Sequence, residues 1–357
     1  MKIKFLAFLM MCASVWAQST IVEKYGHLQV KGNYIFGEKG DTVQLRGMSL
    51  FWSQWMGQYY TPECVKWLKD DWKCTIVRAA MGVDAAEGGY EVSPAEEKAK
   101  IETVVDAAIA NGMYVIIDYH SHHADKNVEL AKKFFTEMAL KYNKYPNVIY
   151  ELYNEPLQES TWDNDIKPYC EAVIKEIRKY DTKNLIVCGT RQWSQMVSEA
   201  AANPIKDNNV AYTLHYYVTS HGKSLRDEAE KAMKMGICLF VTEFGTCHAS
   251  GNGGFNPKQS KVWWDFLDKY HISWCNWSVA DKVETASIIN PGASGKGGWK
   301  PEELTESGNL VKAELVAKNT PILEKLKAKT EAIEKIKSEK IKADKKINEA
   351  QKKMKKK

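Results

Sequence analysis

The stretch NVIYELYNE, residues 147–155, indicates the fold of this chain most clearly. It is rich in apolar, β-branched and aromatic residues, and it ends in Asn154 and Glu155. A nearly continuous apolar run of this length is typical of a strand that is covered on both faces, as in a parallel sheet. Two chemically active side chains therefore stand at the carboxyl end of a buried strand.

Seven further runs of the same kind occur along the chain, and amphipathic segments rich in Lys and Glu separate them. This alternation predicts a parallel sheet covered by helices, and eight βα units predict closure into a (β/α)8 TIM barrel of the α/β class. The alternative, an open doubly wound sheet, lacks a Gly-rich phosphate loop after its first strand. The expected strands are residues 43–50, 74–81, 114–120, 147–155, 184–190, 210–217, 238–245 and 272–279; the expected helices include 94–111, 128–145, 166–180, 225–235 and 260–270.

Two segments precede the first expected strand. Residues 1–17 have the basic start, apolar middle and small-residue end of a secretory signal, and we expect cleavage after Ala17 and secretion of the mature chain. No later segment is long and apolar enough to span a membrane. Residues 27–36 alternate apolar and polar positions around Gly32-Asn33, which predicts a β-hairpin that plugs the barrel floor.

Residues 311–357 form a Lys-rich tail after the barrel domain, which we place at residues 18–310. The tail holds sixteen lysines against seven acidic residues. This surplus exceeds the net charge of +5, so the rest of the chain is net acidic and a nucleic-acid partner is not expected. Thr320-Pro321 predicts a helix start, with apolar residues following at heptad-like spacing. A solvated basic helix or a partly disordered tail is the expectation, and attachment to an acidic surface or a partner helix of unknown identity is the alternative.

Seven cysteines remain once Cys12 leaves with the signal, and an odd number cannot pair completely. Several lie in strand-like runs, where a free buried thiol is the expectation. The candidate disulfides are Cys64 with Cys74 and Cys247 with Cys275.

Polar or aromatic residues end nearly every expected strand. In a barrel these ends converge on one rim, so residues far apart in the sequence become neighbours there. Glu155 and Glu243 end the fourth and seventh strands. Retaining hydrolysis of a glycosidic bond needs two carboxyl groups about 5–5.5 Å apart, one protonated and one ionised, and these two glutamates are the candidates.

At this rim the chain resembles glycoside hydrolase family 5. The resemblance covers roughly residues 28–310 and extends to the bacterial-type cellulase branch. The residues that carry it at the strand ends are Arg78, His120, Tyr153-Asn154-Glu155-Pro156, His215-Tyr216-Tyr217, Glu243-Phe244-Gly245 and Asn276-Trp277-Ser278; those that extend it to the cellulase branch include Arg46-Gly47-Met48-Ser49, Trp55, Gly88-Gly89-Tyr90 and Ala280-Asp281-Lys282.

The resemblance implies a retaining endo-β-1,4-glucanase with Glu155 as general acid/base and Glu243 as nucleophile. It implies that four residues support catalysis: Arg78 and Tyr217 bond the nucleophile, Asn154 binds the sugar 2-hydroxyl, and His215 orients Glu155. Substrate contacts are expected from His120, Trp55, Trp277, Lys282 and Glu284. The expected partner is a β-1,4-glucan and the expected state is a monomer; no cofactor is expected.

Other interpretations remain open from the sequence. A β-mannanase, xylanase or mixed-linkage glucanase would share the barrel and the glutamate pair, and a glycan-binding barrel without catalysis is a further alternative. Phe51 and Gly82 depart from the branch pattern, which has His and Tyr there, so nearby substrate contacts differ. The cluster of His120, His122 and His123 suggests zinc, but glycoside cleavage needs no metal, and none is expected.

Overall fold

The computed structural model describes residues 20–354. The expected signal at residues 1–17 lies outside the described residues. In the described part, the chain divides into a barrel unit, Thr20–Leu323, and a second compact unit to which residues 324–354 belong. No helix in residues 20–354 combines the length and apolar character that a bilayer span requires.

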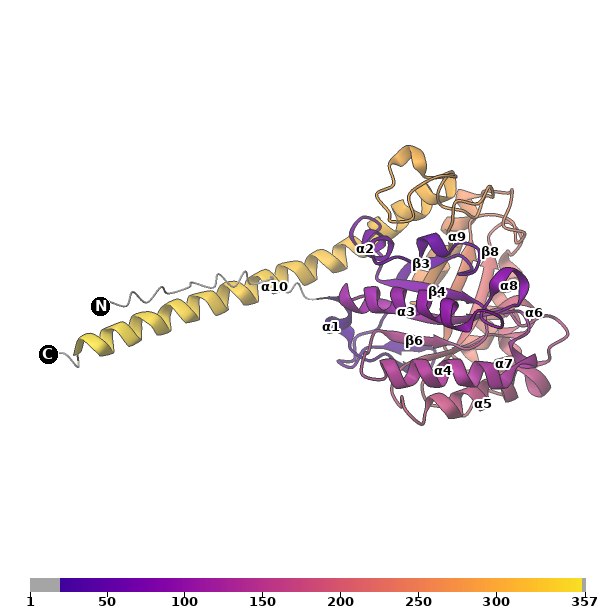
Figure 1. Ribbon diagram of the computed structural model, residues 1–357, viewed down its shortest axis with the longest axis horizontal. Helices are drawn as coiled ribbons and strands as arrows, with labels where there is room; N and C mark the ends of the chain where they lie inside the picture. Colours follow the sequence, from indigo (N-terminus) through magenta and orange to yellow (C-terminus); the bar gives the residue numbers. More distant parts are fainter. Residues whose placement is uncertain (1–19, 355–357) are drawn as a thin grey trace, which may run out of the picture. The chain divides into compact units, whose positions relative to one another are not determined.

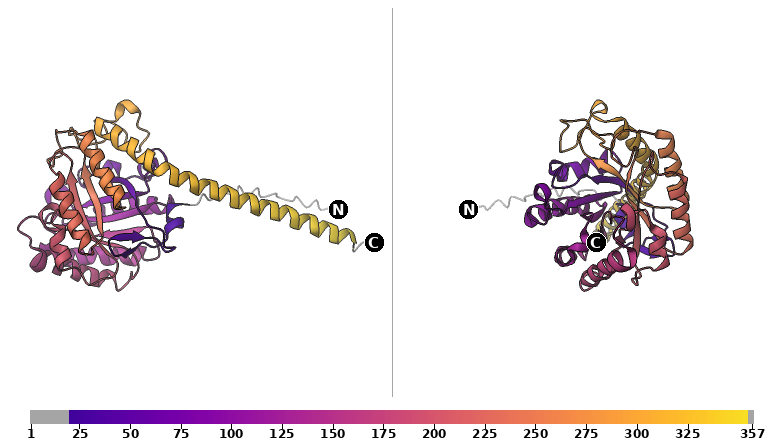
Figure 2. Two further views of the ribbon diagram at one scale, coloured as in Figure 1. Left: turned by 180° about the vertical axis from the view of Figure 1, so that it is seen from behind. Right: turned by 90° about the vertical axis from the view of Figure 1, so that its right-hand side faces the viewer.

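Eight parallel strands of the described chain close into a barrel in the order β10-β3-β4-β5-β6-β7-β8-β9. Helices lie outside these strands (Figures 1 and 2). The TIM barrel predicted from the alternating pattern is therefore confirmed. The barrel strands are β3 (Arg46–Leu50), β4 (Ile76–Gly82), β5 (Tyr114–His120), β6 (Val148–Glu151), β7 (Ile186–Cys188), β8 (Val210–Tyr217), β9 (Leu239–Gly245) and β10 (Trp274–Val279).

The helices fall mainly between successive strands, as expected for βα units. The α-helices are α1 (Ile21–Tyr25), α2 (Pro62–Asp70), α3 (Pro94–Ala110), α4 (Val128–Tyr142), α5 (Lys167–Ile177), α6 (Arg191–Ser194), α7 (Val197–Ala202), α8 (Lys223–Lys234), α9 (Pro257–Lys269) and α10 (Glu306–Met354). Short 3-10 turns occur at Gly57–Tyr59, Ala86–Gly88, Ala124–Lys126 and Pro301–Glu303, and a π-helical turn at Trp162–Ile166.

The predicted hairpin is confirmed as β1 (Gln29–Lys31) and β2 (Tyr34–Phe36), joined at Gly32, whose φ of 62° suits a glycine. The segment around it bonds residues at the amino ends of barrel strands. Val30 N donates to Asn209 Oδ1 at 2.8 Å, and the Tyr114 hydroxyl donates to Gly26 O at 2.7 Å. The amino-terminal segment therefore covers the floor of the barrel, opposite the rim where the strands end.

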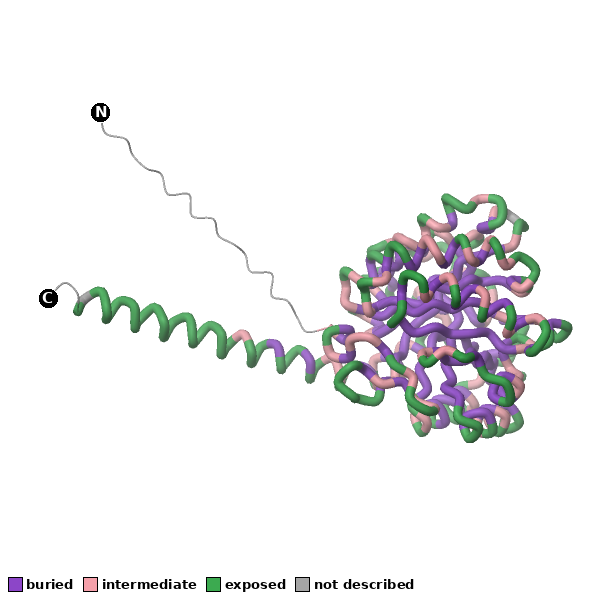
Figure 3. The backbone as a smooth tube through the Cα atoms, turned by 90° about the horizontal axis from the view of Figure 1, so that it is seen from below, coloured by how far each residue is buried: buried purple, intermediate pink, exposed green. Residues whose placement is uncertain are grey.

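The barrel strands are buried along their whole length, as the purple tube in Figure 3 shows. Their β-branched and aromatic side chains pack against the helices outside and one another inside. The interior also holds charged side chains near the rim: Arg78, Asp118 and Glu151 are fully buried. Since buried charges are costly unless paired, this part of the core serves the site and not packing alone.

Neither candidate disulfide is formed, and the expected pairings are wrong: all seven cysteines of the described chain are free and buried. Cys247 points its Sγ to the carbonyl oxygens of the following loop, at 3.4 Å from His248 O, whereas Cys275 lies within β10. Burial raises the pKa of Cys64 and of Cys247 to about 12, so both remain thiols at neutral pH.

The Lys-rich tail is helical, as expected, but its predicted start at Thr320-Pro321 is wrong. α10 begins at Glu306, where the Thr305 hydroxyl accepts the Gly308 N–H at 3.0 Å, and Pro321 lies inside the helix. The first turns of α10 belong to the barrel unit and bury Val311 and Leu315. From residue 324 onward most side chains are exposed, including Ile336 and Ile347.

Asn319 ties α10 to the barrel floor. Its fully buried Nδ2 donates to Arg46 O at 3.2 Å and to Lys73 O at 2.9 Å. We expect Asn319→Leu to lower the free energy of unfolding by about 1–3 kcal/mol, because the half-buried Lys73 carbonyl loses this donor and Arg46 O loses one of its hydrogen bonds. Urea unfolding measures this, and Asn309→Leu, at an exposed position of the same helix, is the control. Equal stabilities of the two variants would contradict the proposed tie.

Candidate active site

Glu155 and Glu243 face each other at the carboxyl rim of the barrel. Glu155 follows β6, and Glu243 lies in β9. One carboxylate oxygen of each and one ring nitrogen of His215 all lie within 4.8 Å of one another. The two glutamates line a hollow of about 230 Å³ that is open to solvent. A separation of this size matches the spacing of two carboxyl groups that act in succession on the same carbon atom, and it is smaller than the roughly 6.5–9.5 Å found where an attacking water lies across the sugar from the acid.

Glu243 is held by two donors. Arg78 Nη1 donates to its Oε2 at 3.0 Å, and the Tyr217 hydroxyl donates to its Oε1 at 2.7 Å. Burial, followed by the charge of Glu243, raises the pKa of Tyr217 well above its usual range, so the phenol keeps its proton. Both bonds stabilise the ionised carboxylate and fix the direction in which it points.

Arg78 is the centre of a fully buried charge cluster. It donates through Nε to Glu151 Oε2 at 2.7 Å, and its Nη2 lies 2.9 Å from Asp118 Oδ2. Burial raises the pKa of Asp118 to about 8 and that of Glu151 to about 7, while the positive charge of Arg78 opposes both shifts. One guanidinium cannot neutralise three carboxylates, so burial of this cluster favours the retention of a proton on one of its carboxyl groups.

Glu155 lies in a different environment. Burial raises its pKa, and the nearby positive charges lower it only in part. His215 Nδ1 lies 2.9 Å from Glu155 Oε1, and His122 Nδ1 lies 3.7 Å from Oε2. Burial lowers the pKa of His215 to about 4, so its imidazole is neutral at neutral pH. Burial thus favours the protonated form of Glu155, whereas Glu243 accepts hydrogen bonds from Arg78 and Tyr217.

Aromatic side chains form the walls of the hollow. His120 stacks on Trp277 with ring centroids 5.1 Å apart and is fixed by a 2.6 Å contact between its Nδ1 and Asp118 Oδ2. Trp55 is 41% exposed, whereas Trp277 is nearly buried, and both line the hollow. Aromatic rings beside carboxylates are typical of sugar-binding clefts.

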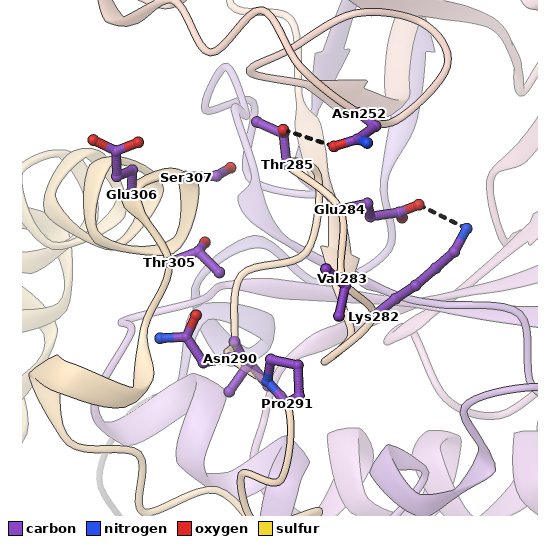
Figure 4. A pocket seen from close by; sticks show the side chains of 11 residues that line it. Asn252, Lys282, Val283, Glu284, Thr285, Asn290, Pro291, Thr305, Glu306 and Ser307 are labelled. Atoms are coloured by element: carbon purple, nitrogen blue, oxygen red, sulfur yellow. Dashed lines mark hydrogen bonds and ion pairs between the residues drawn. The ribbon is translucent and has the colours of Figure 1, made fainter.

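A pair of charged residues marks one end of this hollow. Lys282 Nζ lies 2.7 Å from a Glu284 carboxylate oxygen, and both side chains line the hollow. They also line a neighbouring pocket of about 320 Å³, in which the Thr285 hydroxyl donates to Asn252 Oδ1 (Figure 4). With these two, the structure brings every site residue predicted from the sequence to the carboxyl rim: Arg78, His120, Asn154, Glu155, His215, Tyr217, Glu243, Trp55, Trp277, Lys282 and Glu284.

Comparison with known proteins identifies the family of the chain. The sequence profile described as "Cellulase (glycosyl hydrolase family 5)" matches residues 36–283. The chain belongs to glycosyl hydrolase family 5.

Curated family 5 relatives include Endoglucanase Z of Dickeya dadantii (strain 3937), which is 53% identical over 80% of this chain and 65% of its own length. An endoglucanase of Clostridium saccharobutylicum is 44% identical over 83% of this chain and 66% of its own length. The chain thus spans just under two thirds of the length of these two relatives.

Solved structures give the same result. A structure from Cytophaga hutchinsonii is 63% identical, with a TM-score of 0.85 over 86% of this chain and all of that one. The catalytic domain of Thermobifida fusca endoglucanase Cel5A, in a variant bound to cellotetraose, is 34% identical with a TM-score of 0.79, over 83% of this chain and 99% of that one.

Several side chains of this family 5 site were not singled out from the sequence. Asp118, Glu151 and Thr242 are polar residues inside apolar strand runs, which was the available signal. Trp52 extends the aromatic wall and contacts His120 edge-on at 4.2 Å between ring centroids. Trp193 had no local signal, because its position depends on left-handed backbone conformations at residues 192–194.

Trp193 and Trp277 line two different hollows that share Glu155. Trp193 is 41% exposed and lines a second hollow of about 450 Å³ together with Glu155 and His215. Its backbone N–H donates to Pro156 O at 2.8 Å, which anchors the loop next to the Asn154-Glu155 segment. The acid/base candidate therefore lines two hollows, each of which has a tryptophan in its wall.

The departures from the family branch pattern have structural counterparts. Phe51 packs against Trp277, with ring centroids 5.0 Å apart, and lines the hollow. Gly82 leaves space for Gln54, whose Oε1 would lie 1.9 Å from a Cβ atom at this position. A larger residue at Gly82 would displace Gln54.

Three histidines suggested zinc, but they do not form a metal-binding group in the described part of the chain. There, the side chains close enough to share an ion are Glu155, His215 and Glu243. These are already bonded to one another or to Arg78 and Tyr217. That catalysis requires no metal stays a prediction.

Proposed function

We propose that this chain is a secreted endo-β-1,4-glucanase that hydrolyses internal bonds of cellulose and related β-glucans with retention of configuration. The separation of Glu155 and Glu243, within 4.8 Å, is the observation that carries the proposal. Membership of family 5 and identity to endoglucanases support the choice of glucan. Secretion rests on the signal-like residues 1–17, and a monomeric state is part of the same proposal.

In the first step a Glu243 oxygen attacks the anomeric carbon. The bond from that carbon to the leaving oxygen breaks, and the Glu155 proton passes to that oxygen. Arg78 and Tyr217 hold Glu243 ionised and aimed, so the nucleophile needs no reorganisation. In the second step Glu155, now ionised, takes a proton from water, whose oxygen displaces Glu243 from the sugar.

The other rim residues position the chain of sugars. Arg78 Nη2 donates a hydrogen bond to Asn154 Oδ1 at 2.6 Å. This bond orients the Asn154 amide so that its N–H groups face the hollow and the sugar 2-hydroxyl. Trp277 and Trp55 offer platforms on the side of the hollow lined by Lys282 and Glu284, and Trp193 offers one on the leaving-chain side. His120, buried and neutral, contacts a hydroxyl of the sugar before the cut.

Product analysis on a substrate panel tests the proposal. We expect reducing ends and a rapid fall in viscosity from carboxymethylcellulose, and much slower release from β-mannan and xylan. Faster release of reducing ends from mannan, xylan or mixed-linkage glucan would show that this polysaccharide, and not cellulose, is the substrate. Binding without product release would replace catalysis by a glycan-binding role.

A further inference from the structure

A chain of buried polar groups connects Glu155 to Glu151, away from the hollow. His215 Nδ1 lies 2.9 Å from Glu155 Oε1, and its Nε2 lies 2.9 Å from Thr242 Oγ1. The Thr242 hydroxyl in turn donates to Glu151 Oε1, 2.6 Å away. Thr242 and Glu151 are fully buried, so no solvent enters this sequence of contacts.

Thr242 reaches this position because β9 is irregular. Consecutive residues of a regular strand point to opposite faces, yet Thr242 and Glu243 both bond side chains in the barrel interior. The pairing of β9 shifts register against both of its neighbours, between Thr213 and His215 on β8 and between Trp274 and Asn276 on β10. A bulge of this kind redirects a side chain, and here it adds a hydroxyl beside the nucleophile candidate.

This series of hydrogen bonds determines which atoms carry the protons. A threonine hydroxyl has one proton, and Thr242 donates it to Glu151, whose carboxylate also accepts two N–H groups of Arg78. Thr242 Oγ1 must then accept from His215 Nε2–H. A neutral imidazole has only one N–H, so Nδ1 is an acceptor and its contact with Glu155 requires a protonated Glu155 carboxyl.

We propose that Thr242 is a positioning residue that fixes the tautomer of His215 and thereby keeps the proton of the general acid on Glu155. This inference rests on the proposed function of Glu155. If Glu151 takes up a proton, the direction of every hydrogen bond in the series reverses. Thr242 then donates to His215 Nε2, and His215 Nδ1–H donates to an ionised Glu155. Either way, Glu151 and Glu155 share one proton through His215 and the Thr242 hydroxyl.

Without the Thr242 hydroxyl, no hydrogen bond at Nε2 determines the tautomer of His215. Neutral His215 then holds its proton on Nδ1 and donates it to ionised Glu155, whatever the state of Glu151. A hydrogen bond to the charged form lowers the pKa of an acid. The other titratable or charged groups that face Glu155 are unchanged by the substitution: His122, Arg78, Asp118, Glu243 and Tyr217.

The experiment compares Thr242→Val, which keeps the shape, with Thr242→Ser, which keeps the hydroxyl. For Thr242→Val we expect kcat/KM on cello-oligosaccharides to fall about tenfold and the alkaline limb of its pH profile to move down by about one unit. On a dinitrophenyl cellobioside, whose leaving group needs no proton, kcat/KM should change little. Thr242→Ser should resemble the wild type.

Thr213→Val is the matched control. Thr213 is a fully buried threonine of β8 whose Oγ1 has no hydrogen-bond partner in the described part of the chain. Its replacement should leave both pH limbs in place. If Thr242→Val lowers kcat/KM equally on the two substrates, the substitution disturbs Glu243, and the proposed role of Thr242 is wrong. A Thr242→Ser variant as impaired as Thr242→Val would also overturn the proposal. An inactive wild type would instead refute the proposed function.

Discussion

Replacement of Glu243 by Gln should lower kcat/KM on a soluble β-glucan by about 10⁴-fold or more, because the attacking carboxylate is lost while its two donors remain. Replacement of Glu155 by Gln should cost about 10²- to 10⁴-fold on the same substrate. The Glu155 loss should be much smaller on a dinitrophenyl cellobioside, and the Glu243 loss should not. Initial rates on both substrates measure the difference.

Glu129→Gln is the control for this pair, because Glu129 is an exposed carboxylate on α4 that lines neither of the two hollows. Its activity should equal that of the wild type. The unfolding temperatures of all three variants show whether the fold survives. If either active-site variant turns over β-glucan at the wild-type rate, the roles assigned to the two glutamates are wrong.

The second large effect concerns Arg78. Its replacement by Met leaves Asp118, Glu151 and Glu243 buried without a counter-charge, and we expect a loss of about 3–5 kcal/mol in the free energy of unfolding. Activity should fall as well, because Glu243 loses the hydrogen bond and the positive charge that Arg78 provides. Arg78→Lys should restore little of the lost stability or activity. The lysine ammonium lacks the planar fork of N–H groups with which the guanidinium contacts three carboxylates at once.

The Arg78→Met loss should also depend on pH. Without the guanidinium, the folded pKa values of Asp118 and Glu151, which burial already raises, rise further above their unfolded values, so the folded state binds more protons than the unfolded state. Stability is then retained at low pH and lost as pH rises toward 8. Urea unfolding at pH 5 and pH 8 measures this. Arg191→Met, which breaks a surface pair with Glu199, is the control, and an equal loss in both variants would contradict the account.

The fold followed from the sequence because its signals are local. Each barrel strand is an apolar run, and a polar or aromatic residue at its end, such as Glu155 or Trp277, is recognisable without knowledge of its neighbours. Convergence of these ends then follows from closure of the barrel. The glutamate pair could therefore be predicted from residues eighty-eight positions apart.

The remaining features depend on geometry that the sequence does not display. Thr242 faces inward only because β9 shifts register on both sides, and Trp193 reaches the second hollow only through the left-handed conformations around it. The start of α10 was misplaced because Pro321 is a strong local signal, whereas Thr305 caps the helix through a single side-chain bond. Cysteine pairing depends on where each thiol points, which spacing alone does not determine.

The central claim is that Glu155 and Glu243 act in succession on one anomeric carbon. Proton NMR of the first-formed product from a cello-oligosaccharide tests it directly, if spectra are recorded before mutarotation. The account predicts that the new reducing end appears first as the β-anomer. Initial release of the α-anomer would mean single displacement by water and would contradict the account.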